Sequence, residues 1–219
     1  GAFYTSYMAE NAREELGMLP LEPAIKSIDT VKDKAALVTL MAQLQVKGGD
    51  LPFGWYVNND AKNSSENALY AYQAGLGLPD RDYYLKDDEK FTKIRAAYQT
   101  YIGDILAKAG VTSAENAANA IIELEKTIAQ AQWSRVQSRD ATKSYNKMTV
   151  AEANELMGEF DLSAYFEAVG VDAQELIVRQ PSYFEAFAAI FKNTDLTVWQ
   201  NYLKFHFVSN YAQLLNKDL

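Results

Sequence analysis

The chain of 219 residues contains no cysteine and only one histidine, His206. The first absence excludes disulfides, thiolate metal sites and a cysteine nucleophile within this chain. A zinc site needs three or four His, Cys or carboxylate ligands in a fixed geometry, and a lone histidine does not provide them. We therefore expect His206 to be packed in the core or at a contact surface and hydrogen-bonded to a neighbour, rather than to act as a metal ligand or catalytic base.

Basic residues and long hydrophobic runs are also scarce. The chain has 21 Lys and Arg against 29 Asp and Glu, a formal net charge of -8. A protein of this charge repels phosphate backbones, so nucleic acid is excluded as a partner. No apolar run approaches the roughly 20 residues of a membrane helix, and no signal peptide opens the chain. We therefore expect no transmembrane segment in this chain.

Signatures for phosphate binding or carboxylate catalysis are weak. Gly75-Leu76-Gly77 is not a complete dinucleotide fingerprint, because position 80 is an aspartate. Asp80 and Asp82 flank Arg81, and an acidic hydrolase with an Asp/Glu pair within residues 80–89 is one alternative. We favour a simpler interpretation, in which Asp80 or Asp82 caps a turn and Arg81 forms an ion pair.

Apolar residues recur at helical spacing over most of the chain. The pattern predicts helices over residues 3–16, 30–47, 88–109, 113–138, 150–157, 161–168, 181–192 and 195–216. Thr112 with Glu115, and Thr149 with Glu152, each fit a capping box, and Pro181 suits the first turn of a helix. The final helix is apolar on nearly all sides, which predicts that it is buried centrally or docks on a surface outside this chain.

One segment breaks the helical pattern. Phe53, Trp55 and Val57 alternate with other residues, as in a half-buried strand, and a polar stretch follows. This predicts a two-stranded β-hairpin at about 53–59 and 67–74. Since no repeat, low-complexity stretch or linker interrupts the chain, residues 1–219 are expected to form a single mainly α, multi-helix lobe with one small β-hairpin and no internal boundary.

Six segments together suggest a family. GLGLPDRDYYL (75–85) resembles the GLP-x-RDYY segment of the neprilysin and endothelin-converting-enzyme family of zinc metallopeptidases. Segments resembling other family motifs occur in the family's order: FYTSYMAENA (3–12), DAKNS (60–64), LEKTIA (124–129), YNKMT (145–149) and WQNYLKFHFVSNYAQLL (199–215). The resemblance covers nearly the whole chain. Tyr7 stands where animal members often carry cysteine, which indicates a bacterial, PepO-like member.

The resemblance implies a division of labour between two lobes. The family's zinc ligands, two histidines of His-Glu-x-x-His and a downstream glutamate, lie C-terminal to the matched region, and its substrate-contacting Arg segment lies N-terminal to it. We therefore assign no catalytic, cofactor-binding or metal-binding residue within this chain, and we expect the chain alone to be inactive. The zinc of the parent protein would lie outside this chain.

The same resemblance implies a role, partners and a location. This chain would be part of the N-terminal, non-catalytic lobe, which encloses the active-site cavity and restricts substrate size. Its partners would be the C-terminal catalytic lobe of the same polypeptide and, in the parent, short peptide substrates. Exported relatives favour the bacterial periplasm or cell envelope, and a cytoplasmic location stays open.

A second hypothesis is a freestanding helical scaffold that binds a peptide or protein without enzymatic activity. Both ends of the chain look like the edges of a larger piece. Whether the natural reading frame continues beyond Leu219 into His-Glu-x-x-His discriminates the two hypotheses.

The GLGLPDRDYYL segment is expected to be structural under either hypothesis. Gly75 and Gly77 would allow unusual backbone angles, and Pro79 would fix the turn. The adjacent residues Tyr83 and Tyr84 would anchor the loop in the core. For Arg81 and Asp82, the sequence leaves open whether they act locally or across the interface with the other lobe.

Overall fold

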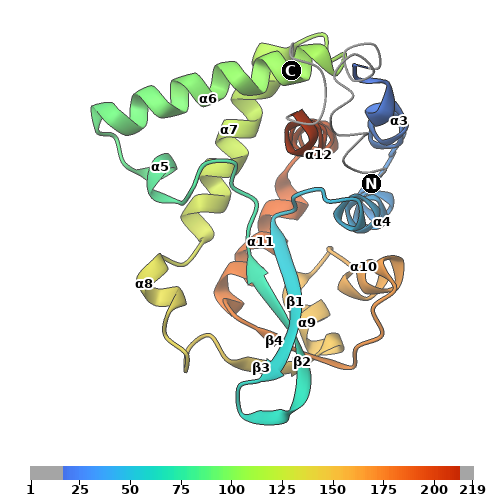
Figure 1. The fold of residues 1–219 in the computed structure, drawn as a ribbon, viewed down its shortest axis with the longest axis vertical. Helices are drawn as coiled ribbons and strands as arrows, with labels where there is room; N and C mark the ends of the chain where they lie inside the picture. The colour runs from blue at the N-terminus through green and yellow to red at the C-terminus, as the bar shows by residue number, and fades with distance from the viewer. Residues whose placement is uncertain (1–16, 213–219) are drawn as a thin grey trace, which may run out of the picture.

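The computed structural model describes residues 17–212 (Figure 1). The helix predicted over 3–16 and the end of the one predicted over 195–216 lie outside these residues. After a 3-10 turn, η1 (Leu19–Leu21), the helices are α3 (Glu22–Asp29), α4 (Lys34–Val46), α5 (Asp82–Leu85), α6 (Glu89–Lys108), α7 (Ala114–Ala131), α8 (Arg135–Ser138), α9 (Val150–Met157), α10 (Leu162–Val169), α11 (Pro181–Asn193) and α12 (Leu196–Tyr211). The predicted mainly α fold is confirmed.

The predicted hairpin is present and belongs to a larger sheet. Strands β1 (Phe53–Asp60) and β2 (Asn63–Gln73) form the hairpin, and β3 (Asn146–Thr149) and β4 (Glu175–Val178) extend it in the order β1-β2-β4-β3. Strand β4 is parallel to β2 and antiparallel to β3. The two added strands have four residues each, too short for an alternating pattern to be recognised in the sequence.

Local signals explain most helix boundaries. The capping box of Thr149 and Glu152 is confirmed, with reciprocal bonds of 3.1 and 2.8 Å between backbone N–H groups and side chains. The predicted position of Pro181 in the first turn of α11 is also confirmed. The capping box predicted at Thr112 is wrong, because the residue that precedes α7 is Ser113, which makes no side-chain capping bond.

The single helix predicted over 113–138 is wrong beyond residue 131. Gln132 adopts an extended conformation, and its side chain donates to the carbonyl of Ala74 at 2.8 Å. Ser134 and Gln137 then form a capping box that starts the short helix α8. A bond to a distant loop therefore ends α7 where the local sequence has neither glycine nor proline.

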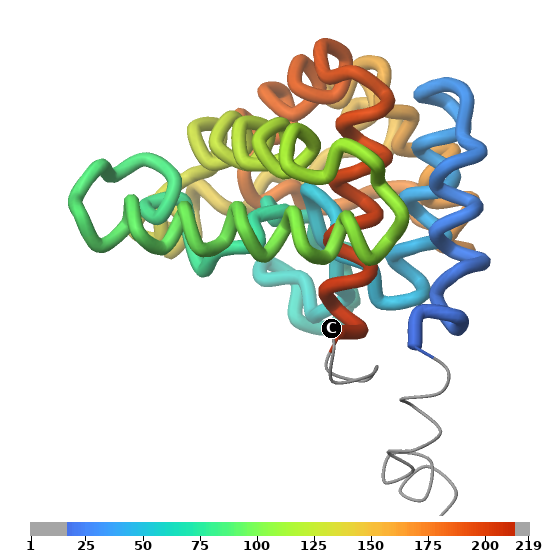
Figure 2. Tube along the Cα trace, turned by 90° about the horizontal axis from the view of Figure 1, so that it is seen from above, coloured from blue at the N-terminus to red at the C-terminus, as the bar shows by residue number. Residues whose placement is uncertain are grey.

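Helix α12 is the centre of the helical part. It contacts α3, α4, α6 and α7, and Figure 2 shows it passing between the α6–α7 pair and the α3–α4 pair. Every residue from Tyr202 to Val208 is at most 5% exposed. The predicted central burial of the final helix is thus confirmed over the described part of α12. None of the helices within residues 17–212 is long and apolar enough to cross a membrane.

The core face of the sheet packs on aromatic side chains. The ring of Phe53 in β1 lies 5.1 to 5.9 Å from four other rings, those of Phe160, Tyr165, Phe184 and Phe187. These residues lie in or next to α10 and α11. Edge-to-face packing of this kind adds to the burial of apolar area, so the hairpin is held firmly against the helices.

Candidate functional site

The lone histidine contacts a buried carboxylate. His206 on α12 is 4% exposed, and its Nε2 lies 2.7 Å from Oε1 of Glu125 on α7, which is fully buried. The hydroxyl of Tyr84 donates to Oε2 of Glu125 at 2.6 Å, and that of Tyr98 to Oε1 at 3.0 Å. The expectation of a packed, hydrogen-bonded histidine is confirmed. We call these four residues the Glu125 cluster.

Two hydroxyl donors and the imidazole of His206 surround the buried carboxylate. An ionised carboxylate only accepts hydrogen bonds, and burying one without partners is costly. Burial, and then the nearby charge of Glu125, raise the pKa of Tyr84 and of Tyr98 well above the ordinary value, so both hydroxyls remain protonated donors. The Glu125 cluster therefore joins α5, α6, α7 and α12 at one point.

The sequence pattern did not single out Glu125. It lies in the LEKTIA segment, beside Leu124 and one turn before Ile128, both buried. A glutamate on the apolar face of a predicted helix was the available signal, because charged side chains are almost never fully buried unless paired.

The GLGLPDRDYYL segment is fixed by the same cluster. The hydroxyl of Tyr84, which donates to Glu125, also accepts from the backbone N–H of Leu78 at 2.9 Å, and the hydroxyl of Tyr202 donates to the carbonyl of Gly75 at 2.9 Å. Tyr84 is 1% exposed, and the ring of Tyr83 packs edge-on against Phe91. The predicted anchoring of the loop by the two tyrosines is confirmed.

The two glycines of this segment have different functions. Gly75 has φ +93°, and a Cβ there would lie 2.5 Å from Cα of Pro52, so the predicted special backbone angle is confirmed. For Gly77 that prediction is wrong, because its φ is not positive. A Cβ at Gly77 would instead lie 1.8 Å from the hydroxyl oxygen of Tyr98. Gly77 makes room for a member of the Glu125 cluster.

The acidic residues of the segment make contacts within the described residues. Oδ1 of Asp80 accepts from the backbone N–H of Asp82 at 2.8 Å, which confirms the predicted turn cap. Asp80 also pairs with Arg135 at 2.9 Å, and Asp82 with Lys86 at 2.8 Å. The hydrogen bond from Lys86 is the main cause that lowers the pKa of Asp82. Asp80 and Asp82, the two carboxylates that flank Arg81, are thus each paired with a cation.

The ion pair predicted for Arg81 is wrong within the described residues. Its Nε donates to the carbonyl of Ala129 on α7 at 3.2 Å, and no carboxylate of residues 17–212 lies within ion-pair distance of it. Arg81 therefore ties the loop to α7 through a neutral acceptor.

A second carboxylate joins two further motif segments. Asp60, 3% exposed, accepts from the backbone N–H of Lys62 and from the hydroxyl of Tyr145, both at 2.8 Å. Nζ of Lys147 lies 3.6 Å from Asp60, and Nζ of Lys62 lies 4.3 Å from the ring centre of Tyr145. DAKNS and YNKMT, far apart in sequence, thus meet at the tip of the hairpin. We call Asp60, Lys62, Tyr145 and Lys147 the Asp60 cluster.

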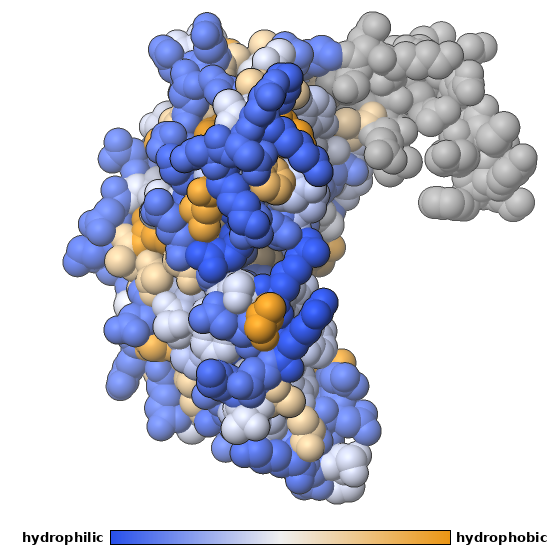
Figure 3. Space-filling view, turned by 90° about the vertical axis from the view of Figure 1, so that its left-hand side faces the viewer, coloured by the Kyte–Doolittle hydropathy of each residue, from blue (hydrophilic) through white to orange (hydrophobic). Residues whose placement is uncertain are grey.

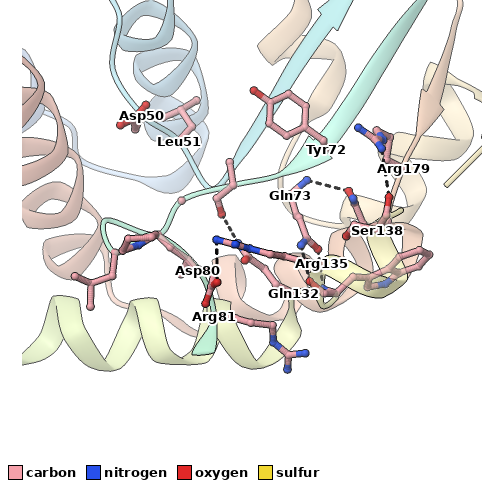
Figure 4. Close-up of a pocket in the computed structure, with 17 residues that line it drawn as sticks. Asp50, Leu51, Tyr72, Gln73, Asp80, Arg81, Gln132, Arg135, Ser138 and Arg179 are labelled. Atoms are coloured by element: carbon pink, nitrogen blue, oxygen red, sulfur yellow. Dashed lines mark hydrogen bonds and ion pairs between the residues drawn. The ribbon is translucent and has the colours of Figure 1, made fainter. Parts of the chain in front are cut away.

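A recess of about 460 Å³ opens where the parallel strands β2 and β4 end (Figure 4). Its walls come from residues 50–51, 72–81, 132–138 and 179–180. Gln73 links three of these segments: its backbone N–H donates to Gln180 at 3.1 Å, and its side chain exchanges two hydrogen bonds with the backbone of Trp133, at 2.8 and 2.9 Å. The carboxyl ends of parallel strands are a common place for ligand sites.

The sequence pattern missed this recess because it depends on the break after α7 and on β4, neither of which was predicted. Within residues 17–212, no group of three or more His, Cys, Asp or Glu side chains is arranged to hold a metal ion. The recess is lined by arginine, amide, tyrosine and serine side chains and by two aspartates, the exposed Asp50 and Asp80, which is paired with Arg135. Such a set of polar groups suits ligand binding.

Comparisons with known protein families and sequences find similarity over nearly the whole chain. The profile of peptidase family M13 matches residues 1–219. The chain is 26% identical over 233 residues to endothelin-converting enzyme 1 of Cavia porcellus, an alignment that covers 98% of this chain and 30% of that protein.

Solved structures are also similar to this chain over nearly its whole length. The chain is similar to the zinc metalloprotease Zmp1 of Mycobacterium tuberculosis in complex with an inhibitor, with 30% identity and a TM-score of 0.92 over 98% of this chain and 33% of that one. The open state of Zmp1 matches with 30% identity and a TM-score of 0.92, covering 34% of its chain. The chain thus spans about a third of the length of these relatives.

Proposed function

Because the chain belongs to peptidase family M13, the family of zinc metallopeptidases that its motifs resemble, we propose that it is a non-catalytic lobe of a neprilysin-like zinc metalloendopeptidase. The parent enzyme hydrolyses short peptides. This lobe, formed by residues 1–219 as a single unit, encloses the active-site cavity and restricts the size of the substrates that enter.

One observation carries the proposal. Nearly the whole chain, 98% of it, aligns with only a third of a zinc metalloprotease of the same fold. A part of that size within a larger peptidase is the size of a lobe rather than of a complete enzyme. The alignment with endothelin-converting enzyme 1, over 30% of that protein, supports the same relation.

The geometry supports a rigid lobe that encloses a cavity, rather than a reaction centre. The Glu125 cluster fixes four helices and the GLGLPDRDYYL segment to one another, so the lobe has a stiff interior. A wall that excludes large substrates must keep its shape, and buried, fully bonded polar networks make a fold rigid.

The zinc of the family does not fit the residues described. His206 and Glu125 already bond to each other in the core, and no third ligand stands near them within residues 17–212. We therefore propose that zinc is bound outside this chain, by the C-terminal catalytic lobe of the same polypeptide. The similarity to the mycobacterial protein supports a bacterial enzyme, for which we propose a periplasmic or cell-envelope location.

The test uses the natural full-length protein and a series of substrates of increasing size, from five-residue peptides to a folded protein that carries the same cleavable sequence in a loop. The account predicts that kcat/KM is highest for short peptides and falls steeply with length. An unfolded variant of the large substrate is the control for access to the peptide bond. Cleavage of the folded protein as fast as the free peptide would contradict a size-restricting lobe.

A further inference from the structure

We propose that the recess at the ends of β2 and β4 binds a carboxylate group of a peptide through the guanidinium of Arg179. The inference rests on the proposed function only in taking a peptide as the ligand. The carboxylate is either the C-terminus of the peptide or an acidic side chain, and the experiment below separates these sources.

Arg179 is held in place but lacks a charged partner. It directly follows β4, and its backbone N–H donates to the carbonyl of Ala71 in β2 at 2.9 Å. Its guanidinium makes only long contacts with neutral acceptors, 3.5 Å to the hydroxyl of Tyr56 and 3.4 Å to the carbonyl of Ser138. Within residues 17–212 no carboxylate lies within ion-pair distance of it. A guanidinium has five donors in a planar fork that matches a carboxylate.

The acidic residues of the recess do not neutralise Arg179. Asp80 is paired with Arg135 at 2.9 Å, and Figure 4 shows this pair on the other side of Gln73 from Arg179. Asp50 is exposed and lies at the far side of the recess in the same view. In a chain of net charge -8, the recess therefore presents a cation that is open to an anionic group.

A second polar group beside Arg179 lacks a partner. Oγ of Ser138 is buried and forms no hydrogen bond within the described residues, and Ser138 lines the recess next to Arg179. Buried hydroxyls are normally hydrogen-bonded, so an unpaired one calls for an explanation. A carboxylate that bonds to Arg179 has a second oxygen, and a serine hydroxyl is a suitable donor for it.

The size and character of the recess favour a peptide. A volume of about 460 Å³ lies in the range of small-molecule sites and accommodates one or two residues. On the face that carries α5 and α8, hydrophobic groups are small and separated by hydrophilic ones (Figure 3). This is unlike the continuous apolar patch on which another folded domain docks. Three arginines line the recess. Arg135 is paired with Asp80, and Nε of Arg81 donates to the carbonyl of Ala129 at 3.2 Å. Within the described residues, Arg179 has only its two longer contacts, which suits one carboxylate rather than a polyanion.

The experiment measures equilibrium binding of short peptides to the natural full-length protein, with a zinc chelator present so that bound peptide is not cleaved. Three versions of one glutamate-containing peptide are compared: unmodified, C-terminally amidated, and with glutamate replaced by glutamine. The protein variants are Arg179→Gln and, as the matched control, Arg139→Gln, an exposed arginine that does not line the recess.

We expect one of the two neutralised peptides to bind the wild type about tenfold more weakly than the unmodified peptide, as loss of a charge-assisted hydrogen bond implies. That peptide identifies the source of the carboxylate. Arg179→Gln should weaken binding of the unmodified peptide by a similar factor and abolish the difference between the two, and Arg139→Gln should change neither. Arg179→Lys, which keeps the charge but not the fork, should retain part of the preference.

Three outcomes would overturn the proposal: equal binding of all three peptides to the wild type, a carboxylate preference that persists in Arg179→Gln, or equal weakening of all peptides by that variant. Because the contacts of Arg179 are long, its replacement should not unfold the protein, and a thermal melt checks this. Failure of the proposed function is distinguished by a separate readout, the absence of turnover of the unmodified peptide by the zinc-loaded wild type.

Discussion

The Glu125 and Asp60 clusters use the same chemistry in different surroundings. Each has a carboxylate that joins segments far apart in sequence; Glu125 accepts from two tyrosine hydroxyls and Asp60 from one. Glu125 lies at the centre of the helical part among buried partners, whereas Asp60 lies at the tip of the hairpin, where Lys62 is exposed and the side chain of Lys147 is 37% exposed. The electrostatic strength of a contact depends on its distance from water, so the first cluster should matter far more to stability than the second.

The largest expected effect is that of Glu125→Ala. The substitution leaves the buried groups of His206, Tyr84 and Tyr98 without their acceptor, and breaking a buried charged network in this way costs about 3–5 kcal/mol of the free energy of unfolding. The measurement is urea denaturation. Glu123→Ala, an exposed glutamate on the same helix, is the control and should change stability by less than about 0.5 kcal/mol. Equal losses of unfolding free energy in the two variants would contradict the claim that the Glu125 cluster stabilises the fold more than an exposed glutamate does.

Gly75→Ala tests the loop that the Glu125 cluster anchors. The positive φ of Gly75 disfavours any side chain, and its Cβ would meet the backbone of Pro52. Strain of this kind costs about 1–3 kcal/mol. Gly110 also has a positive φ, +84°, but a Cβ there meets nothing within 4 Å. The difference in melting temperature between Gly75→Ala and Gly110→Ala therefore measures the close approach of residue 75 to Pro52. Identical melting temperatures of the two variants would show that this close approach costs no stability.

Tyr84→Phe removes one hydroxyl from the Glu125 cluster. Oε2 of Glu125 loses its donor and the N–H of Leu78 its acceptor, for an expected loss of about 1–3 kcal/mol. Amide hydrogen exchange over residues 75–85 should become faster. Tyr83→Phe is the matched control, since the ring of Tyr83 packs on Phe91 without a hydrogen bond from its hydroxyl in the described residues. The account would be wrong if both variants exchanged alike.

Asp60→Asn should have the smallest effect at neutral pH and a distinct dependence on pH. The N–H of Lys62, and next the hydroxyl of Tyr145, lower the pKa of Asp60 below its ordinary value of 3.8. A carboxylate with a lowered pKa in the folded state contributes stability above the unfolded value, and this is lost as the pH falls through the folded value. As the pH is lowered from neutral to values below 3.8, the free energy of unfolding of the wild type should therefore fall towards that of Asp60→Asn. An advantage that did not change with pH would argue against an ionised Asp60 as the centre of the cluster.

Much of the fold was predictable because local sequence patterns, namely apolar spacing and capping residues, determine many of its helices. The helices that became α6, α9, α10 and α11 begin and end within one residue of prediction, since their apolar spacing and caps agree. The break after α7 could not be predicted, because Gln132 leaves the helix to bond with a distant loop carbonyl. Strands β3 and β4 were missed for a similar reason: each is short and depends on pairing with residues far away in the chain.

The same division applies to the two sites. Three residues of the Glu125 cluster, Tyr84, Glu125 and His206, lie in motif segments, but nothing in the sequence showed that they meet one another and Tyr98. A charged residue on the apolar face of α7 was the one local signal. The recess around Gln73 and Arg179 had no local signal in the sequence, because its walls come from four stretches that only the tertiary structure brings together.

The central claim is that this chain is one lobe of a zinc metallopeptidase whose bond-breaking residues lie elsewhere. Its most direct test is the turnover of a quenched fluorescent peptide by purified residues 1–219 with added zinc, measured beside the natural full-length protein. The account predicts hydrolysis by the full-length protein, abolished by a chelator and restored by zinc, and none by the chain alone. Zinc-dependent turnover by residues 1–219, or a full-length protein that cleaves no peptide, would contradict it.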